Sequence, residues 1–178
     1  MDLNTTGLLD LSRTLAGDYL TRFTYPWEAL DGIKELILAL GPTLGEEYEE
    51  LGAGVWVHQT AQIAHSAFLG APCIIGPHTE VRHCAFIRGS ALVGANCVVG
   101  NSVELKNAIL FDNVQTPHYN YVGDSILGDF VEVGCNSVLN PGTVVGPRTN
   151  IYPLSCVRGA VPGDSIYKTG GIIVKKEK

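Results

Sequence analysis

From Val57 to about Pro162, an aliphatic or aromatic residue stands at every sixth position of the chain. The position four residues later is mostly small, and the position directly after the large residue is often glycine. A period of six fits neither the 3.6-residue period of a helix nor the two-residue alternation of a strand. The repeat predicts an all-β solenoid, a parallel β-helix in which one large residue per hexad fills the interior. The first register is Val57, Ile63, Leu69, Ile75, Val81, Ile87, Val93, Val99, Leu105 and Phe111, and the second is Leu127, Val133, Leu139, Val145, Ile151 and Val157.

Charge and composition exclude several classes of protein. The net charge is −6 and basic residues cluster only near the C-terminus, so the chain lacks the basic footprint that nucleic acid requires. It has no stretch of about 18 apolar residues and no signal peptide pattern, so we expect no membrane span. The five cysteines show no CxxC pairing, and two stand at small inward positions, which favours buried, reduced thiols over a metal site. These features predict a cytoplasmic protein.

Residues 1–54 differ from the repeat and predict an N-terminal helical extension and linker. A weaker helical pattern covers residues 8–20, and the acidic stretch 45–50 predicts a solvated linker or a short helix. We expect the β-helix over residues 55–162 and a solvated tail over residues 163–178. The main helix is indicated by Trp27, Leu30, Ile33, Ile37 and Leu40 at helical spacing, with Pro26 in its first turn and Gly41 at its end.

The hexad pattern breaks once, between Phe111 and Leu127, where the interval is not a multiple of six. Irregular backbone in a rigid scaffold is typical of a bulge or of a place where chemistry is sited. The interrupted stretch contains residues 116–124, with His118 and two tyrosines. It is therefore the first candidate for a functional site.

Hexads of this kind resemble those of the left-handed β-helix of hexapeptide acyltransferases. The resemblance implies three hexads per triangular coil, so that residues 55–162 would form about six coils stacked about 4.8 Å apart. It also implies association into a homotrimer with sites between subunits, because the ends and flat faces of such a solenoid need to be covered.

With eighteen residues per coil, Arg88 and Lys106 would lie one directly above the other. Like charges about 5 Å apart repel by about 3 kcal/mol at an effective dielectric near 20, which favours an anionic ligand such as a phosphate between them. By the same count, Arg82 and His118 would lie in line at the neighbouring corner. In the alternative interpretation, carboxylates neutralise these cations in surface ion pairs. The carboxylates considered are Glu80, Glu104 and Asp112.

Three longer runs carry a more specific resemblance: AFIRG at 85–89, GNSVELKNA at 100–108 and HYNYVGDSILGD at 118–129. They are similar to the C-terminal acyltransferase domain of the bifunctional glucosamine-1-phosphate N-acetyltransferase / UDP-N-acetylglucosamine pyrophosphorylases and of related sugar-1-phosphate nucleotidylyltransferases. Residues 25–30 also resemble the helix that joins the two domains of those enzymes. The nucleotidylyltransferase domain has no counterpart in this sequence, so its activity is not implied.

The resemblance implies roles for five residues. His118 would match the catalytic base that removes a proton from the sugar amine before the amine attacks an acyl thioester. Arg88, Lys106 and Tyr121 would match residues that hold the sugar phosphate or the nucleotide-sugar product, and Glu132 stands where the family has a sugar-binding Asn. The acyl donor would be acetyl-CoA, attacked directly, and no metal is implied. Independently of the resemblance, histidine is the natural base for an amine near neutral pH.

The donor side of the expected site departs from the family in two places. The loop that closes over the acetyl group is missing, since residues 133–141 continue straight into the next hexad. Tyr152 stands where small residues normally admit the pantetheine arm. The alternative function is therefore a non-catalytic trimer that binds a sugar phosphate or nucleotide sugar and partners a separate nucleotidylyltransferase.

A γ-type carbonic anhydrase shares the expected fold and is a third alternative. His78 and His83 have the His-x4-His spacing of that family, but no histidine two coils earlier supplies a ligand from a neighbouring subunit. Zinc needs at least three protein ligands. We therefore expect His78 and His83, like His58 and His65, to be ordinary turn residues.

Overall fold

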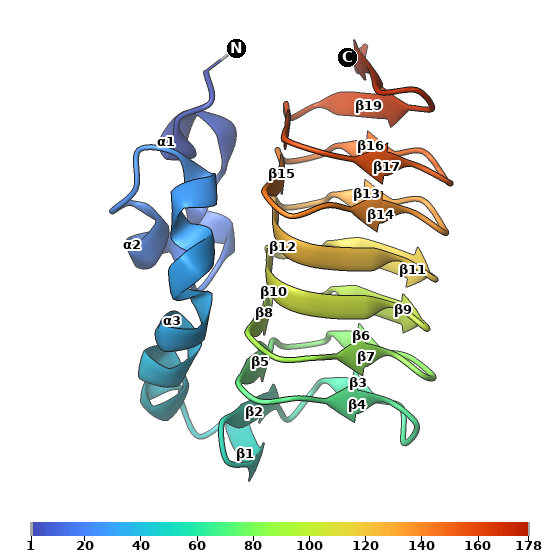
Figure 1. Cartoon of the computed structure of the whole chain (residues 1–178). Coiled ribbons are helices and arrows are strands. Elements are labelled where there is room, and N and C mark those ends of the chain that lie inside the picture. Colours follow the sequence, from blue (N-terminus) through green and yellow to red (C-terminus); the bar gives the residue numbers. More distant parts are fainter. Residues whose placement is uncertain (1, 178) are drawn as a thin grey trace.

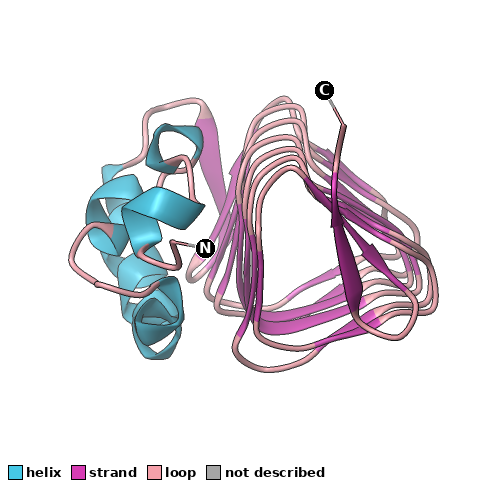
Figure 2. Ribbon diagram, turned by 90° about the horizontal axis from the view of Figure 1, so that it is seen from above, coloured by secondary structure: helices cyan, strands magenta, loops and turns pink. Residues whose placement is uncertain are grey.

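The computed structural model describes residues 2–177 and confirms the parallel β-helix, a left-handed solenoid of about six turns with helices along one side (Figure 1). Viewed down its axis, the solenoid is triangular, because each turn passes through three flat sheet faces (Figure 2). Strands of neighbouring turns pair in parallel on every face. We call these the covered face, which lies against the helices, the aromatic face, which displays Phe68 and Phe86, and the polar face, which displays Gln115 and Glu132.

Two long strands, β10 (Glu104–Leu110) and β12 (Tyr121–Leu127), run around the corner between the aromatic and covered faces. Their first halves belong to the aromatic face and their second halves to the covered face. The other strands of the aromatic face are β4 (Phe68–Leu69), β7 (Phe86–Ile87), β14 (Val138–Leu139) and β17 (Cys156–Val157). The covered face adds β2 (Val55–His58), β5 (Cys73–Ile75), β8 (Ala91–Val93), β15 (Thr143–Val145) and β18 (Ala160–Val161). The polar face consists of β3 (Gln62–Ile63), β6 (Glu80–Val81), β9 (Val98–Asn101), β11 (Gln115–His118), β13 (Glu132–Val133), β16 (Asn150–Ile151) and β19 (Ser165–Lys168).

The aliphatic hexad positions form the interior of the solenoid, as the repeat predicts. Ile75, Ile87 and Val99, from the three faces, are fully buried in one continuous core. The small residues fill the corners, where Ala85 and Cys97 are also buried. Burial without a compensating charge raises the pKa of the Cys97 thiol to about 12, so it stays protonated and inert.

The position of the interruption differs from the prediction. Leu110, not Phe111, occupies the inward column, because Leu110 pairs with Val93 of the turn below. Phe111 instead packs among the N-terminal helices. The inward spacing shortens from six residues to five at two places, between Leu105 and Leu110 and between Val122 and Leu127. Both five-residue steps form the same corner on adjacent turns, which we call the shortened corners.

The N-terminal extension covers one face of the solenoid. Its main helix begins at Pro26 and ends before Gly41, as predicted, but the first half is a 3-10 helix. It packs against an outward apolar column that alternates with the inward one along the covered face. The helices are α1 (Thr5–Leu8), η1 (Leu11–Arg13), α2 (Gly17–Leu20), η2 (Pro26–Gly32), α3 (Ile33–Leu40) and η3 (Gly41–Thr43). The outward column is Trp56, Ile74, Leu92, Ile109, Ile126 and Val144.

Both ends of the solenoid carry an antiparallel strand. The acidic stretch expected to be a linker or a short helix contributes to β1 (Tyr48–Gly52), which pairs antiparallel with β2. At the other end the parallel stack continues beyond Pro162, since β19 pairs with β16 and places Tyr167 in the interior. The chain then turns back into β20 (Ile172–Lys175), antiparallel to β19.

Candidate functional site

Arg88 and Lys106 lie on adjacent turns at the corner between the aromatic and covered faces, as predicted. The pairing of Leu105 with Ile87 places the two cations one above the other. Each has a carboxylate partner: Arg88 Nη1 lies 2.9 Å from Glu104 Oε1, and Lys106 Nζ lies 3.5 Å from Asp124 Oδ2. Ion pairs therefore neutralise both cations. Glu104 is one of the expected partners, whereas Asp124 is not.

The shortened corners shift Asp124 by one position relative to Lys106. Because the turn between them has seventeen residues rather than eighteen, Lys106 stands beside Gly123, with Asp124 next to it. Asp124 Oδ1 accepts a hydrogen bond of 2.9 Å from Asn107 Nδ2, which also donates to the Leu30 carbonyl of η2 at 3.1 Å. A count of eighteen residues per coil does link Lys106 to Asp124, but it places Asp124 directly above Lys106, whereas Asp124 stands in register with Asn107.

Tyr121 lies at the same corner, which we call the cation corner (Arg88, Lys106, Tyr121, Gly123 and Asp124). The Tyr121 hydroxyl lies over Gly123, so closely that a side chain at position 123 would displace it. Gly123 in turn stands in register with Lys106. The structure thus brings three of the predicted phosphate-binding residues together.

His118 lies at the opposite edge of the aromatic face, at the end of β11. It stands in register with Asn101, and Pro117, not His118, is in line with Arg82, so the predicted alignment of Arg82 with His118 is wrong by one residue. The reason is again the seventeen-residue turn. The His118 side chain is exposed and makes no hydrogen bond to another residue within 2–177, and Arg82 pairs with Glu80 at 2.8 Å.

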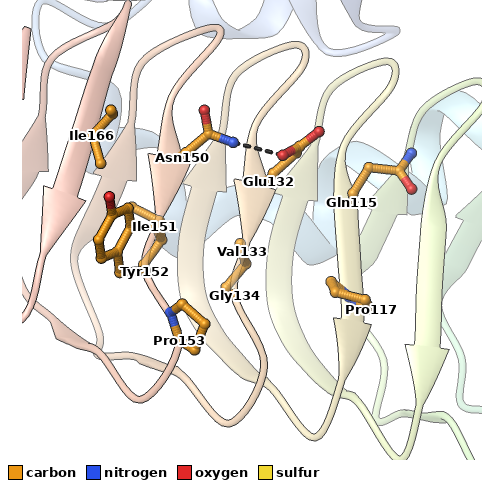
Figure 3. A pocket seen from close by; sticks show the side chains of 10 residues that line it. All are labelled: Gln115, Pro117, Glu132, Val133, Gly134, Asn150, Ile151, Tyr152, Pro153 and Ile166. Carbon is orange, nitrogen blue, oxygen red and sulfur yellow. Dashed lines mark hydrogen bonds between the residues drawn. The ribbon is translucent and has the colours of Figure 1, made fainter. Parts of the chain in front are cut away.

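Glu132 lies on the polar face, away from the cation corner. Its Oε2 accepts a hydrogen bond of 2.6 Å from Asn150 Nδ2 (Figure 3). Both residues line a hollow of about 560 Å³ that spans four neighbouring turns. The hollow is mostly apolar and includes Pro117, the residue before His118. Glu132 therefore shares a surface with the His118 corner, but not with Arg88 and Lys106.

Tyr152 lines this hollow. Its ring stands with Pro153 along one side, and Val133 and Gly134 form part of the floor (Figure 3). The hollow thus includes Tyr152, where the sequence departs from the expected family, and reaches Pro117, the residue before His118.

A buried carboxylate lies outside these surfaces, at the corner between the covered and polar faces. Asp129 has a side chain only 3% exposed, and its Oδ1 has no hydrogen-bond partner among residues 2–177. Burial raises the pKa of this carboxyl, and Arg148, 3.8 Å from Oδ2, offsets only part of the effect. Arg148 also forms a close, exposed pair with Asp164 at 2.7 Å.

The described part of the chain holds no group of three or more His, Cys, Asp or Glu residues arranged to bind a metal ion. Over residues 2–177, no helix combines the length and hydropathy that a membrane crossing requires.

The chain matches a family model described as the LbH domain of EIF2B subunit epsilon, over residues 53–157. Among curated proteins it is 28% identical over 155 residues to the bifunctional protein GlmU of Streptomyces griseus, covering 78% of this chain and 31% of that protein. It is 36% identical over 70 residues to GlmU of Methanococcus maripaludis, covering 35% of this chain and 16% of that protein. The chain thus spans less than a third of the length of these relatives.

Solved structures share the fold at low sequence identity. AntD, an N-acyltransferase from Bacillus cereus crystallised with dTDP and 3-hydroxybutyryl-CoA, has a TM-score of 0.58 and 16% identity, covering 72% of this chain and 82% of that one. The perosamine N-acetyltransferase of Caulobacter crescentus, crystallised as a point mutant with CoA and GDP-perosamine, has a TM-score of 0.54 and 19% identity, covering 67% and 56%.

Proposed function

Because the chain belongs to the left-handed β-helix family of the EIF2B subunit epsilon domain, and is of the GlmU acyltransferase type, we propose that it transfers an acetyl group from acetyl-CoA to the amine of a sugar phosphate. The observation that carries the proposal is the aromatic face, which has His118 at one edge and the stacked cations Arg88 and Lys106 at the other. The solved structures of N-acyltransferases with CoA and nucleotide sugars support the class of both substrates.

In this proposal the cation corner holds the acceptor. A phosphate would take the place of the carboxylates of Glu104 and Asp124, since Arg offers bidentate geometry and Lys a mobile point charge. The Tyr121 hydroxyl, held over Gly123, would add a hydrogen bond to the phosphate or the sugar. The sugar ring would then lie across the aromatic face and direct its amine toward His118.

The transfer itself would be a direct attack. His118 accepts a proton from the amine, the amine nitrogen bonds to the thioester carbonyl carbon, and the carbon–sulfur bond breaks. The protonated His118 then returns the proton to the leaving thiolate, which departs as the thiol of CoA. The groove beside Pro117 would take the pantetheine arm, and Glu132 would contribute a polar group on its wall. Nothing in this scheme requires a metal.

A thiol-release assay with acetyl-CoA and glucosamine-1-phosphate tests this function. We expect the wild-type protein to release thiol and His118→Asn to lower turnover about 100-fold or more, the usual contribution of a general base. His65→Asn is the matched control, because His65 is an exposed histidine at the same corner of a lower turn. Equal rates in wild type and His118→Asn would refute the role of His118.

The second candidate function is a non-catalytic binder of nucleotide sugars that partners a separate nucleotidylyltransferase. It is favoured by the absence of an orienting partner for the His118 ring among residues 2–177, since a catalytic base is usually held by a third group. It predicts no thiol release but measurable binding of UDP-N-acetylglucosamine by calorimetry. Lys106→Ala would weaken that binding under either function.

We also propose a homotrimer in the cytoplasm. The aromatic face exposes 57% of Phe68 and 42% of Phe86, which association would cover. All five cysteines are free, in keeping with a reducing compartment. Light scattering on the purified protein would give the mass of the assembly.

A further inference from the structure

We infer that Asn107, braced by the N-terminal extension, is a positioning residue that holds Asp124 back from Lys106 and so keeps Lys106 available to an anionic ligand. The inference rests on the proposed function, in which Lys106 binds a phosphate. It adds Asn107, Asp124 and the backbone of η2 to the site.

The geometry of the two ion pairs at the cation corner carries the argument. Arg88 and Glu104 are 2.9 Å apart, the length of a tight charge-assisted hydrogen bond. Lys106 and Asp124 are 3.5 Å apart, well beyond that length, although the Lys106 side chain is flexible and 44% exposed. Lys106 is thus the cation with the looser internal partner, and a ligand displaces less when it binds there.

The cause of the longer distance is the second hydrogen bond that Asp124 makes. Its Oδ1 accepts from Asn107 Nδ2 at 2.9 Å, so only Oδ2 faces Lys106. Asn107 is itself fixed, because the same Nδ2 donates to the Leu30 carbonyl at 3.1 Å. Leu30 is 8% exposed and belongs to the core between the helices and the covered face, so its carbonyl is a rigid anchor.

The fold supplies this arrangement through the two shortened corners. Asn107 and Asp124 occupy equivalent positions on adjacent turns, and both have left-handed backbone, with φ of 49° and 46°. Asparagine and aspartate tolerate this conformation better than other residues with a side chain. The corner therefore places an amide donor directly below a carboxylate acceptor without strain beyond what these residues accept.

Asn107→Gly is the decisive variant, since glycine keeps the left-handed backbone and removes both hydrogen bonds. We expect Asp124 to turn both oxygens toward Lys106 and to weaken the binding of UDP-N-acetylglucosamine about two- to tenfold by calorimetry. Asp124→Asn should instead strengthen binding by up to about fivefold, because it removes the competing charge. Asn113→Gly is the control, with φ of 63° at a different corner.

A double variant separates positioning from a merely structural role. In the Asp124→Asn background, Asn107→Gly should no longer change the affinity, because no carboxylate remains to close on Lys106. The inference is overturned if Asn107→Gly binds like wild type, if Asn113→Gly weakens binding equally, or if the effect of Asn107→Gly persists without Asp124.

A second measurement needs no ligand. Trace acetylation with acetic anhydride, read by peptide mass spectrometry, reports the reactivity of Lys106 relative to the exposed Lys34. We expect Asn107→Gly to lower that ratio about twofold or more, since a tighter ion pair protects the amine. If wild type fails to bind the nucleotide sugar but the ratio falls, the proposed phosphate site fails and the positioning of Asp124 stands. An unchanged ratio overturns the inference.

Discussion

Strands β10 and β12 each belong to two faces. The outward residues of one half pack against the helices, whereas those of the other half are available to a ligand. Inward, both halves carry buried aliphatic residues such as Leu105 and Leu110. Outward, the covered half carries Ile109, buried under the helices, whereas the aromatic half carries Glu104 and Tyr121, which remain partly exposed. The inward residues thus serve the core along the whole strand, whereas the outward residues decide whether a face packs against its own chain or is left open for a ligand.

The largest expected effect tests the covered half. Ile109→Ala should lower the free energy of unfolding by about 2–5 kcal/mol, because Ile109 is fully buried and the rigid solenoid cannot collapse around the cavity. Val138→Ala, which truncates an outward residue 41% exposed on the aromatic face, should lower it by less than about 1 kcal/mol. Urea titrations of both variants make the measurement, and equal losses would show that the two faces are not distinct.

On the open half, Gly123→Ala should affect binding more than folding. The new methyl group meets the flexible end of Tyr121, so the ring moves rather than the backbone. We expect the affinity for UDP-N-acetylglucosamine to fall about two- to tenfold, equivalent to the loss of one hydrogen bond, with little change in Tm. Calorimetry and thermal melts on the same preparation check this, and a large fall in Tm with unchanged affinity would contradict it.

At the edge of the covered face, Asp129→Asn should stabilise the protein at pH 7 by about 1 kcal/mol, because it removes a buried charge whose Oδ1 has no partner. Burial raises the folded-state pKa of Asp129 above the ordinary 3.8. The protonated, neutral carboxyl therefore favours the folded state relative to the ionised one. This stabilising contribution is fully present below pH 3.8 and is lost as the pH rises through the folded pKa. The advantage of Asp129→Asn should therefore shrink on acidification. Unfolding curves between pH 3.5 and 7 measure the difference in free energy of unfolding between Asp129→Asn and wild type. A difference that does not change with pH would contradict burial of the charge as its cause.

The smallest effect concerns the exposed carboxylate that pairs with the same arginine. A hydrogen bond from Arg148 lowers the pKa of Asp164, so this pair stabilises the fold above pH 3.8 and loses its contribution as the pH falls through the lower folded pKa. Both side chains are 50% exposed, so Asp164→Asn should cost no more than about 0.5 kcal/mol at pH 7. High salt should remove even this difference. A loss that survives 1 M NaCl would indicate a structural role instead.

The sequence predicts the interior of this molecule well because the one large apolar residue in each hexad is buried inside the solenoid. It misplaces the interruption because Leu110 and Phe111 are adjacent and both apolar, and because Thr116 takes an inward position without being aliphatic. The outward column of the covered face did leave a signal. Runs such as 73–75 and 91–93 contain three apolar residues in succession. Because side chains alternate along a strand, the inward column needs only the first and the third, and the middle residue belongs to the outward column.

The residues of the candidate site were predicted individually, but of the two carboxylates that pair with its cations only Glu104 was. Arg88 and Lys106 lie within a regular part of the repeat, so counting places them correctly. Asp124 and His118 lie in the turn after the first shortened corner, where the residue in register one turn below is seventeen positions earlier rather than eighteen. The contact between Asn107 and Leu30 joins residues 77 positions apart, and no local pattern indicates it.

The antiparallel strands at the two ends of the solenoid have a consequence for assembly. A β-helix could in principle lengthen by stacking copies end to end, since each parallel ladder exposes unpaired backbone groups at its last strand. Here β1 and β20 reverse the chain direction at one edge of the covered face and one edge of the polar face. A second molecule stacked on those two ends meets a strand of reversed direction, so the uniform parallel ladder is interrupted there, which disfavours growth into filaments.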